Sequence, residues 1–143
     1  MAALFTVHRD GYTISTNPGR LDMDAIADML SRAYWAHSRT RATLERALEN
    51  SLVFGLYAGG DQIGLARVVT DYGVFAYLCD VIIHEDYRGK GLGAWLLESV
   101  HNHPDLQGLR RWLLVTRDAH GLYRKFGWEP LKDPERWMGI FNG

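Results

Sequence analysis

The chain has 143 residues, of which 47% are hydrophobic and 23% are charged, a composition typical of a globular protein and not of a disordered or fibrous one. Sixteen lysines and arginines against seventeen acidic residues give a formal charge of −1, which argues against a nucleic-acid partner because such binders usually carry a basic excess. The one cysteine, Cys79, excludes an internal disulfide and a cysteine-based zinc site.

The length and the absence of a linker predict one domain over residues 1–143. The beginning of the chain is too polar for a signal peptide. No stretch approaches the ~20 apolar residues that a membrane-spanning helix requires. We therefore expect a cytoplasmic protein that has no membrane partner.

The first half of the chain predicts a strand, two helices and a hairpin, in that order. Residues 12–16 alternate weakly, as in a strand. A helical spacing with Asp22 as its cap then joins five side chains, Met23, Ile26, Ala27, Leu30 and Tyr34. A second helix is expected over residues 42–49. The β-forming run at residues 51–58 ends at Gly59-Gly60, which predicts a hairpin to a partner strand over residues 62–69.

The second half predicts a strand–helix–strand–helix pattern followed by terminal strands. Residues 74–83 form a long apolar run, typical of a central strand that is buried on both faces. A helix is expected over residues 92–100, a strand over residues 110–115, and a helix over residues 119–126 with Gly127 as its C-cap. Residues 128–141 read as one or two short strands. The predicted fold is an α/β (α+β) sheet with helices on both faces.

The most informative segment is the glycine-rich turn between the central strand and the next helix. Glycines allow backbone N–H groups to approach a phosphate, and the first N–H groups of a helix lack partners and carry a positive dipole. Arg88 and Lys90 add positive charge. This arrangement predicts a diphosphate site.

Two known nucleotide patterns do not fit this turn. The Walker loop needs four residues between its glycines and then Lys and Ser or Thr, and the dinucleotide fingerprint needs a different spacing from that of Gly89, Gly91 and Gly93. A module that binds the phosphates of ATP or GTP is therefore disfavoured. A charged turn without a ligand is the plainer alternative.

Two motifs resemble the GNAT superfamily of N-acetyltransferases. The spacing of Arg88, Gly91 and Gly93 is similar to its acyl-CoA signature. Residues 116–128 resemble its second motif at five positions, Leu122, Tyr123, Lys125, Gly127 and Trp128. The order of the predicted strands and helices also matches that of the family from Tyr12 onward.

The resemblance implies a mixed, mostly antiparallel sheet whose central strands, residues 78–84 and 111–116, splay apart to admit acetyl-CoA. The pantetheine arm would pair with the backbone of Val81, Ile82 and Ile83. The pyrophosphate would lie on the turn and the first helical residues, namely Arg88, Gly89, Lys90, Gly91, Leu92, Gly93 and Ala94. Thr116 occupies a position where the family often has an asparagine that contacts the cofactor. We expect the Thr116 hydroxyl to make this contact instead.

The implied reaction is direct attack of a primary amine on the thioester through a tetrahedral intermediate, with oxyanion donors on the backbone near Ile82. Tyr123 matches the tyrosine that protonates the leaving thiolate, although by itself it would read as core packing. Asp80 is a candidate base, or else a structural acceptor where the strands splay. Many relatives carry an acid at the position of Cys79, which is interpreted here as a small buried side chain.

For the acceptor, the segment with Tyr34, Trp35 and Arg39 is expected to wall the pocket, with ordinary helix packing as the alternative. We expect a small-molecule amine, with a peptide or protein amine and an inactive CoA-binding sensor as alternatives. The histidines do not predict a metal site. The apolar residues 137–141 are a candidate homodimer contact.

Overall fold

The structure, a computed structural model, describes residues 3–36 and 38–143. Strands occur at β1 (Thr6–Arg9), β2 (Tyr12–Ser15), β3 (Leu52–Ala58), β4 (Asp61–Thr70), β5 (Phe75–Ile83) and β6 (Arg111–Leu113). The α-helices are α1 (Met23–Ser31), α2 (Arg41–Glu49), α3 (Leu92–Asn102) and α4 (His120–Arg124). In the described ranges, no helix is both long enough and apolar enough to cross a bilayer.

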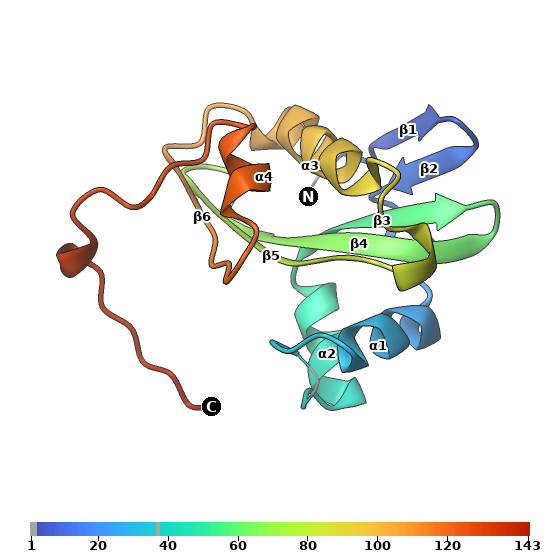
Figure 1. Ribbon diagram of the computed structural model, residues 1–143, viewed down its shortest axis with the longest axis horizontal. Coiled ribbons are helices and arrows are strands. Elements are labelled where there is room, and N and C mark those ends of the chain that lie inside the picture. The colour runs from blue at the N-terminus through green and yellow to red at the C-terminus, as the bar shows by residue number, and fades with distance from the viewer. Residues whose placement is uncertain (1–2, 37) are drawn as a thin grey trace.

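One sheet takes up these strands in chain order. Neighbouring strands are antiparallel from β1 to β5, and β6 runs parallel to β5. Helices α1 and α2 lie on one face of the sheet, and α3 and α4 lie on the other (Figure 1). The predicted mixed, mostly antiparallel sheet with helices on both faces is therefore confirmed.

The first hairpin is an element that the sequence pattern did not predict. Strand β1 pairs with β2 across a turn at Asp10 and Gly11, both of which have positive φ. Asp-Gly is a favoured pair for such a tight turn. The sequence offered little indication of this strand because β1 is largely exposed and lacks an alternating apolar pattern.

Two apolar cores fill the two sides of the sheet. The larger core lies between the sheet and α3, around Phe54, Leu96 and Leu97. The smaller core joins α1 and α2 to the opposite face. The expectation that residues 74–83 are buried on both faces was wrong, because buried and half-buried residues alternate along β5.

The helix ends follow local capping rules, with one difference from the prediction. Asp22 caps α1 by accepting a hydrogen bond from the Ala25 N–H at 3.1 Å. The expected helix reached Tyr34, but α1 ends at Ser31 because the N–H groups of Arg32 and Ala33 bond three residues back and tighten the last turn. After α4, Gly127 has positive φ, and the N–H of Trp128 bonds back to the Tyr123 carbonyl. The cap residue itself is Lys125, and Gly127 is the left-handed glycine that ends the helix, as the sequence predicts.

The end of the chain corrects the prediction of terminal strands. Residues 128–141 contain no strand, and their one regular element is a single turn of 3₁₀-helix at Pro134–Arg136. This red segment leaves the sheet and runs out beside it (Figure 1). An apolar pattern favours a strand only where a neighbouring strand pairs with it, and within this chain the segment pairs with none in the described residues.

Candidate functional site

The site begins where β5 and β6 part. Their parallel pairing covers only three residue pairs and ends at Tyr77 and Leu113. Just beyond, the register between β4 and β5 shifts, with Leu65 opposite Ile82 but Arg67 opposite Cys79, so β5 carries an extra residue. This bulge includes Asp80, whose φ of 51° lies in the left-handed region that aspartate tolerates better than most residues. A bulge bends its strand, and this one lies just beyond the point where the pairing of β5 with β6 ends, as the splay implied by the family resemblance requires.

The bulge also exchanges the faces of β5. Ala76 and Leu78 belong to the core under α3, whereas Ile82 packs into the core with α1 and α2. Val81 and Ile83, in turn, pack toward α3. One extra residue reverses the alternation because side chains along a strand repeat with a period of two. Beyond Tyr77, β5 has no ladder partner on its β6 side among the described residues.

Three side-chain donors from the described residues enclose the carboxylate of Asp80. Oδ2 accepts hydrogen bonds from Arg39 Nη1 and Arg67 Nε, both at 2.7 Å, and Oδ1 accepts one from Trp35 Nε1 at 2.9 Å. The Asp80 side chain is only 1% exposed. Burial by itself would raise the pKa of Asp80, but the hydrogen bonds and charges of the two guanidinium groups outweigh it and hold the pKa below its usual value.

This Asp80 cluster, comprising Asp80, Arg39, Arg67 and Trp35, joins three parts of the chain. Sequence reasoning missed Arg67, although a lone arginine inside the apolar strand β4 is a usable signal, because a buried charge requires a partner. Arg67 also donates to Ser51 Oγ at 3.2 Å. If Asp80 had a structural role, we expected it to accept hydrogen bonds from backbone N–H groups. The donors are instead the side chains of Trp35, Arg39 and Arg67.

Tyr34, the third residue predicted to wall the acceptor pocket, contacts the connection between β6 and α4. The guanidinium of Arg117, in the β6–α4 connection, lies 3.9 Å from the ring centre of Tyr34. Tyr34 also meets Trp35 edge to face at 5.1 Å. The segment between α1 and α2 therefore contacts both β5 and the connection that leads into α4. Tyr34, Trp35 and Arg39, which were predicted to wall one pocket, lie close together.

The N-terminus of α3 is built of backbone. Gly91 stands at the N-cap in the left-handed conformation with φ of 75°, and it makes no side-chain capping bond. Gly89 also has positive φ, at 80°. The first N–H groups of α3 thus have no side-chain acceptor from the cap, which is the arrangement that binds anions at helix N-termini.

The glycines of this turn leave space beside the helix end. A Cβ atom on Gly89, Gly91 or Gly93 would meet no heavy atom within 4 Å. Packing within the protein therefore does not explain the glycine at position 93, which has no positive φ. The free space and the uncapped donors fit the pyrophosphate of acetyl-CoA.

The other residues predicted around the cofactor have distinct places. Arg88 Nε donates to the Ile83 carbonyl at 3.1 Å and so holds the turn against the end of β5, and Lys90 is exposed. Leu92 turns its side chain into the core. Ala94 lies in the first turn of α3.

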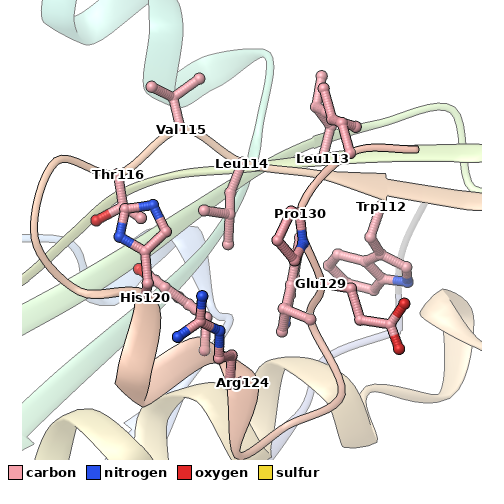
Figure 2. Close-up of a pocket in the computed structure, with 12 residues that line it drawn as sticks. Trp112, Leu113, Leu114, Val115, Thr116, His120, Arg124, Glu129 and Pro130 are labelled. Atoms are coloured by element: carbon pink, nitrogen blue, oxygen red, sulfur yellow. The ribbon is translucent and has the colours of Figure 1, made fainter. Parts of the chain in front are cut away.

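Tyr123 and Thr116 line one cavity of about 290 Å³ beside α4. Figure 2 shows the side chains of Leu114 and Trp112 on the α4 side of their segment, with Trp112 beside Glu129, while Leu113 and Val115 point away. Burial raises the pKa of Tyr123, and nearby Tyr34 adds to the rise. The phenol is therefore protonated at neutral pH, as a proton donor must be.

Two further side chains have settled local roles. Thr116 Oγ1 accepts a hydrogen bond from the Ala119 N–H at 3.1 Å and fixes the turn that leads into α4. Burial raises the pKa of the Cys79 thiol to about 11, so the thiolate is scarce at neutral pH. This agrees with the interpretation of Cys79 as a packed side chain and not a nucleophile.

Comparison with known proteins identifies the family. The sequence profile of the family described as "Acetyltransferase (GNAT) domain" matches residues 49–130. The chain belongs to the GNAT acetyltransferase family. FG08082 from Gibberella zeae, an acetyltransferase by name, is 35% identical over 140 residues, which span 82% of this chain and 78% of that protein. The resemblance seen in the two GNAT motifs is thus confirmed.

Solved GNAT structures share the fold. A structure assigned to the GNAT family from Xanthomonas campestris superposes with a TM-score of 0.90 at 40% identity and covers 94% of this chain and 96% of its own. A GNAT-family acetyltransferase from Elizabethkingia anophelis with acetyl-CoA bound has a TM-score of 0.67 at 16% identity, over 87% of this chain and 80% of its own. The latter likeness is one of fold.

Proposed function

We propose that this GNAT protein transfers the acetyl group of acetyl-CoA to the primary amine of a small molecule. The observation that carries the proposal is the uncapped, glycine-lined N-terminus of α3, which directly follows the strand that has parted from β6. Family membership supports acetyl transfer, and this site supports acetyl-CoA as the donor. When bound, acetyl-CoA supplies the thioester that the amine attacks through a tetrahedral intermediate.

Each candidate residue has a role in this proposal. The backbone of Val81, Ile82 and Ile83 lines the parted edge of β5, where its N–H groups are placed to hold the pantetheine arm and to stabilise an oxyanion. The N–H groups at the start of α3 hold the pyrophosphate. Tyr123 keeps its proton at neutral pH and gives it to the departing thiolate.

Asp80 acts in this proposal as a positioning residue. Its two oxygens accept three hydrogen bonds, and its lowered pKa makes it a weak base, so neither property suits the removal of a proton from an ammonium ion. Its role is to hold Trp35 and Arg39 over the opening. The amine is expected to lose its proton to water.

The acceptor class follows from the same cluster. The segment with Tyr34 and Trp35 is tied to Asp80 and to Arg117, which covers the opening from the side of α1 and α2 and favours a small acceptor over a protein chain. Asp80 faces two guanidinium groups, so the cluster carries one excess positive charge. Arg39 keeps 27% of its side chain exposed. We therefore propose an acceptor with a carboxylate or phosphate near its amine.

Thiol release from acetyl-CoA tests this proposal. A panel of primary amines with and without a carboxylate is compared with peptides that carry a free N-terminus or a lysine. The anionic small amines should give the highest kcat/KM, and Arg39→Gln should raise their KM about tenfold while leaving that of neutral amines nearly unchanged. Arg41→Gln is the matched control, because Arg41 pairs with Asp24 and Glu45 at the surface. Release with peptides alone would contradict the small acceptor, and binding without release would indicate a CoA sensor.

A further inference from the structure

The last turn of α3 carries His101, which lies among aromatic rings from three parts of the chain. The centre of its ring is 5.1 Å from that of Trp112 in β6, 6.0 Å from that of Phe126 and 5.8 Å from that of Trp128. Trp112 and Trp128 also meet edge to face at 5.9 Å. We call these four residues, His101, Trp112, Phe126 and Trp128, the His101 cluster. The cluster joins α3 and β6 to the segment that follows α4.

One hydrogen bond sets the protonation state of His101. The indole N–H of Trp128 donates to His101 Nε2 at 3.0 Å. An indole nitrogen can only donate, so this bond assigns a neutral imidazole with its proton on Nδ1. A proton on Nε2 would place two donors against each other and break the bond. Burial favours the same neutral state, because it lowers the pKa of His101 below the ordinary value of 6.5.

The surroundings of His101 do not offset this effect of burial. The three rings packed on it are not titratable, and Tyr123 keeps its proton at neutral pH. The charged and titratable side chains on the neighbouring elements are exposed or bonded elsewhere, namely Glu98 and His103 on α3, Arg111 on β6, and Arg124, Lys125 and Glu129 on α4 and after it. Protonation of His101 therefore gains no counter-charge from the described residues.

Trp128 connects the His101 cluster to Tyr123. The backbone N–H of Trp128 bonds to the Tyr123 carbonyl at 3.3 Å, and the two rings meet edge to face at 6.0 Å. Helix α4 has only five residues and no side-chain hydrogen bond at its N-cap, so contacts with the rest of the protein must hold it. The place of the Tyr123 phenol thus depends on where Trp128 is held, and His101 holds its indole.

We propose that neutral His101 is a positioning residue, which holds Trp128 and through it keeps the phenol of Tyr123 where it can reach the departing thiolate. This role rests on the proposed function, in which Tyr123 protonates that thiolate. When His101 gains a proton, Trp128 loses its acceptor and Tyr123 loses its support. Turnover then falls, whereas acetyl-CoA, held at the start of α3, still binds.

The pH profile of kcat separates positioning from packing. Wild-type kcat should fall along an acid limb with a midpoint below pH 6.5. His101→Gln offers the indole an amide oxygen that does not titrate, so kcat should stay near the wild-type plateau and this limb should vanish. His101→Leu offers no acceptor and should lower kcat about tenfold at neutral pH, with acetyl-CoA affinity changed less than about twofold. His8→Gln, in the exposed strand β1, is the control and should keep the limb. An acid limb that persists unchanged in His101→Gln would overturn the proposal.

A double variant tests whether His101 acts through Tyr123. Adding His101→Leu to Tyr123→Phe should lower kcat no further, because the phenol that His101 positions is already gone. A second loss of about tenfold in the double variant, as independent sites would give, contradicts the proposed route.

Nuclear magnetic resonance separates a failure of this proposal from a failure of the proposed function, because it needs no turnover. Tryptophan and tyrosine are isotopically labelled, and Trp128→Phe and Tyr123→Phe identify the two signals among those of five tryptophans and seven tyrosines. The Trp128 indole N–H and the Tyr123 ring should shift together as the pH falls below 6.5, and both should stay fixed in His101→Gln. Signals that do not move would overturn the proposal even in an active enzyme. Signals that move together in a protein that releases no thiol would support the link from His101 to Tyr123 and contradict the proposed function alone.

Discussion

The Asp80 cluster in β5 and the start of α3 differ in how many of their hydrogen-bonding groups find partners within the protein. At Asp80, buried charges meet within the protein, and three side-chain donors enclose one carboxylate. Eleven residues after Asp80, Gly91 stands at the N-cap of α3 with no side-chain capping bond, and there is free space beside the glycines of this turn. A buried polar group that is satisfied internally serves the structure, whereas donors that are left uncapped beside open space are available to a ligand. We therefore assign positioning to the Asp80 cluster and cofactor binding to the start of α3.

The largest expected effect is on stability at the Asp80 cluster. Asp80→Asn keeps the shape of the side chain but leaves Arg67, whose side chain is 13% exposed, without a counter-charge. Breaking a buried pair in this way should lower the free energy of unfolding by about 3–5 kcal/mol in urea titration. Glu85→Gln breaks the exposed pair with Arg32 and should cost less than about 1 kcal/mol. Equal losses in the two variants would mean that the cluster is not a structural centre.

The pH dependence of the same group sharpens the distinction between structure and catalysis. Because the folded pKa of Asp80 is lowered, its contribution to stability is present above the ordinary value of 3.8 and is lost as the pH falls below it. Between pH 5 and 9, the ionisation of Asp80 should therefore cause no change in either the free energy of unfolding or kcat. A limb in the kcat profile that disappears in Asp80→Asn would instead identify Asp80 as a base.

The next effect concerns the affinity for acetyl-CoA. Gly93→Asp adds a negative charge to the first turn of α3, where it suits the helix dipole but repels a pyrophosphate. Isothermal titration should show about a 100-fold loss of acetyl-CoA affinity, while the melting temperature without ligand stays the same or rises. The matched control is Gly60→Asp, in the β3–β4 turn, where a Cβ also meets no heavy atom within 4 Å. An unchanged affinity in Gly93→Asp would contradict pyrophosphate binding at this helix end.

A smaller effect is expected for Tyr123 in catalysis. Tyr123→Phe removes the phenol proton and should lower kcat about 10- to 100-fold with little change in acetyl-CoA affinity. Because burial raises the pKa of Tyr123, wild-type activity should not fall from its ionisation until the pH exceeds the ordinary value of 10. Stopped-flow thiol release across pH measures both quantities. Full activity in the phenylalanine variant would return Tyr123 to the role of a packed aromatic.

The smallest effect is expected for the single donor of Trp35. Trp35→Phe removes the hydrogen bond to Asp80 Oδ1 while Arg39 and Arg67 stay in place. We expect a loss of about 1 kcal/mol in stability and a rise of a few-fold in the KM for the amine, with kcat almost unchanged. Steady-state kinetics at saturating acetyl-CoA measures the split. A loss in kcat with an unchanged KM would place Trp35 near the chemistry and not in the wall of the acceptor site.

Local sequence patterns predicted much of the sheet and the glycine turn. Strands β3 to β5, helices α2 and α3 and the left-handed glycine at position 127 follow from periodicity and turn chemistry, which act over a few residues. The Asp80 cluster could not be predicted in full, because Trp35 and Arg39 lie more than 40 residues from Asp80 and meet it only through the fold. The bulge that reverses the faces of β5 is likewise a property of strand pairing and not of composition.

The end of the chain shows a limit of a different kind. Residues 137–141 have the apolar character of a strand, and the sequence favoured one. A strand needs a partner, and within one chain the neighbouring edge is already lined by residues 128–131. The prediction failed because the apolar character of a segment does not determine whether a neighbouring strand is available to pair with it.

The most direct test of the central claim compares two ligands that differ in the pyrophosphate. Thermal unfolding is followed with acetyl-CoA and with S-acetylpantetheine, which carries the same thioester and arm but ends before the phosphates. Acetyl-CoA at 100 times its dissociation constant should stabilise the protein by about 2.7 kcal/mol and raise the midpoint by roughly 5–10 °C, whereas S-acetylpantetheine at the same concentration should leave it nearly unchanged. Equal shifts with both ligands would show that the start of α3 holds no phosphate and would contradict the assignment.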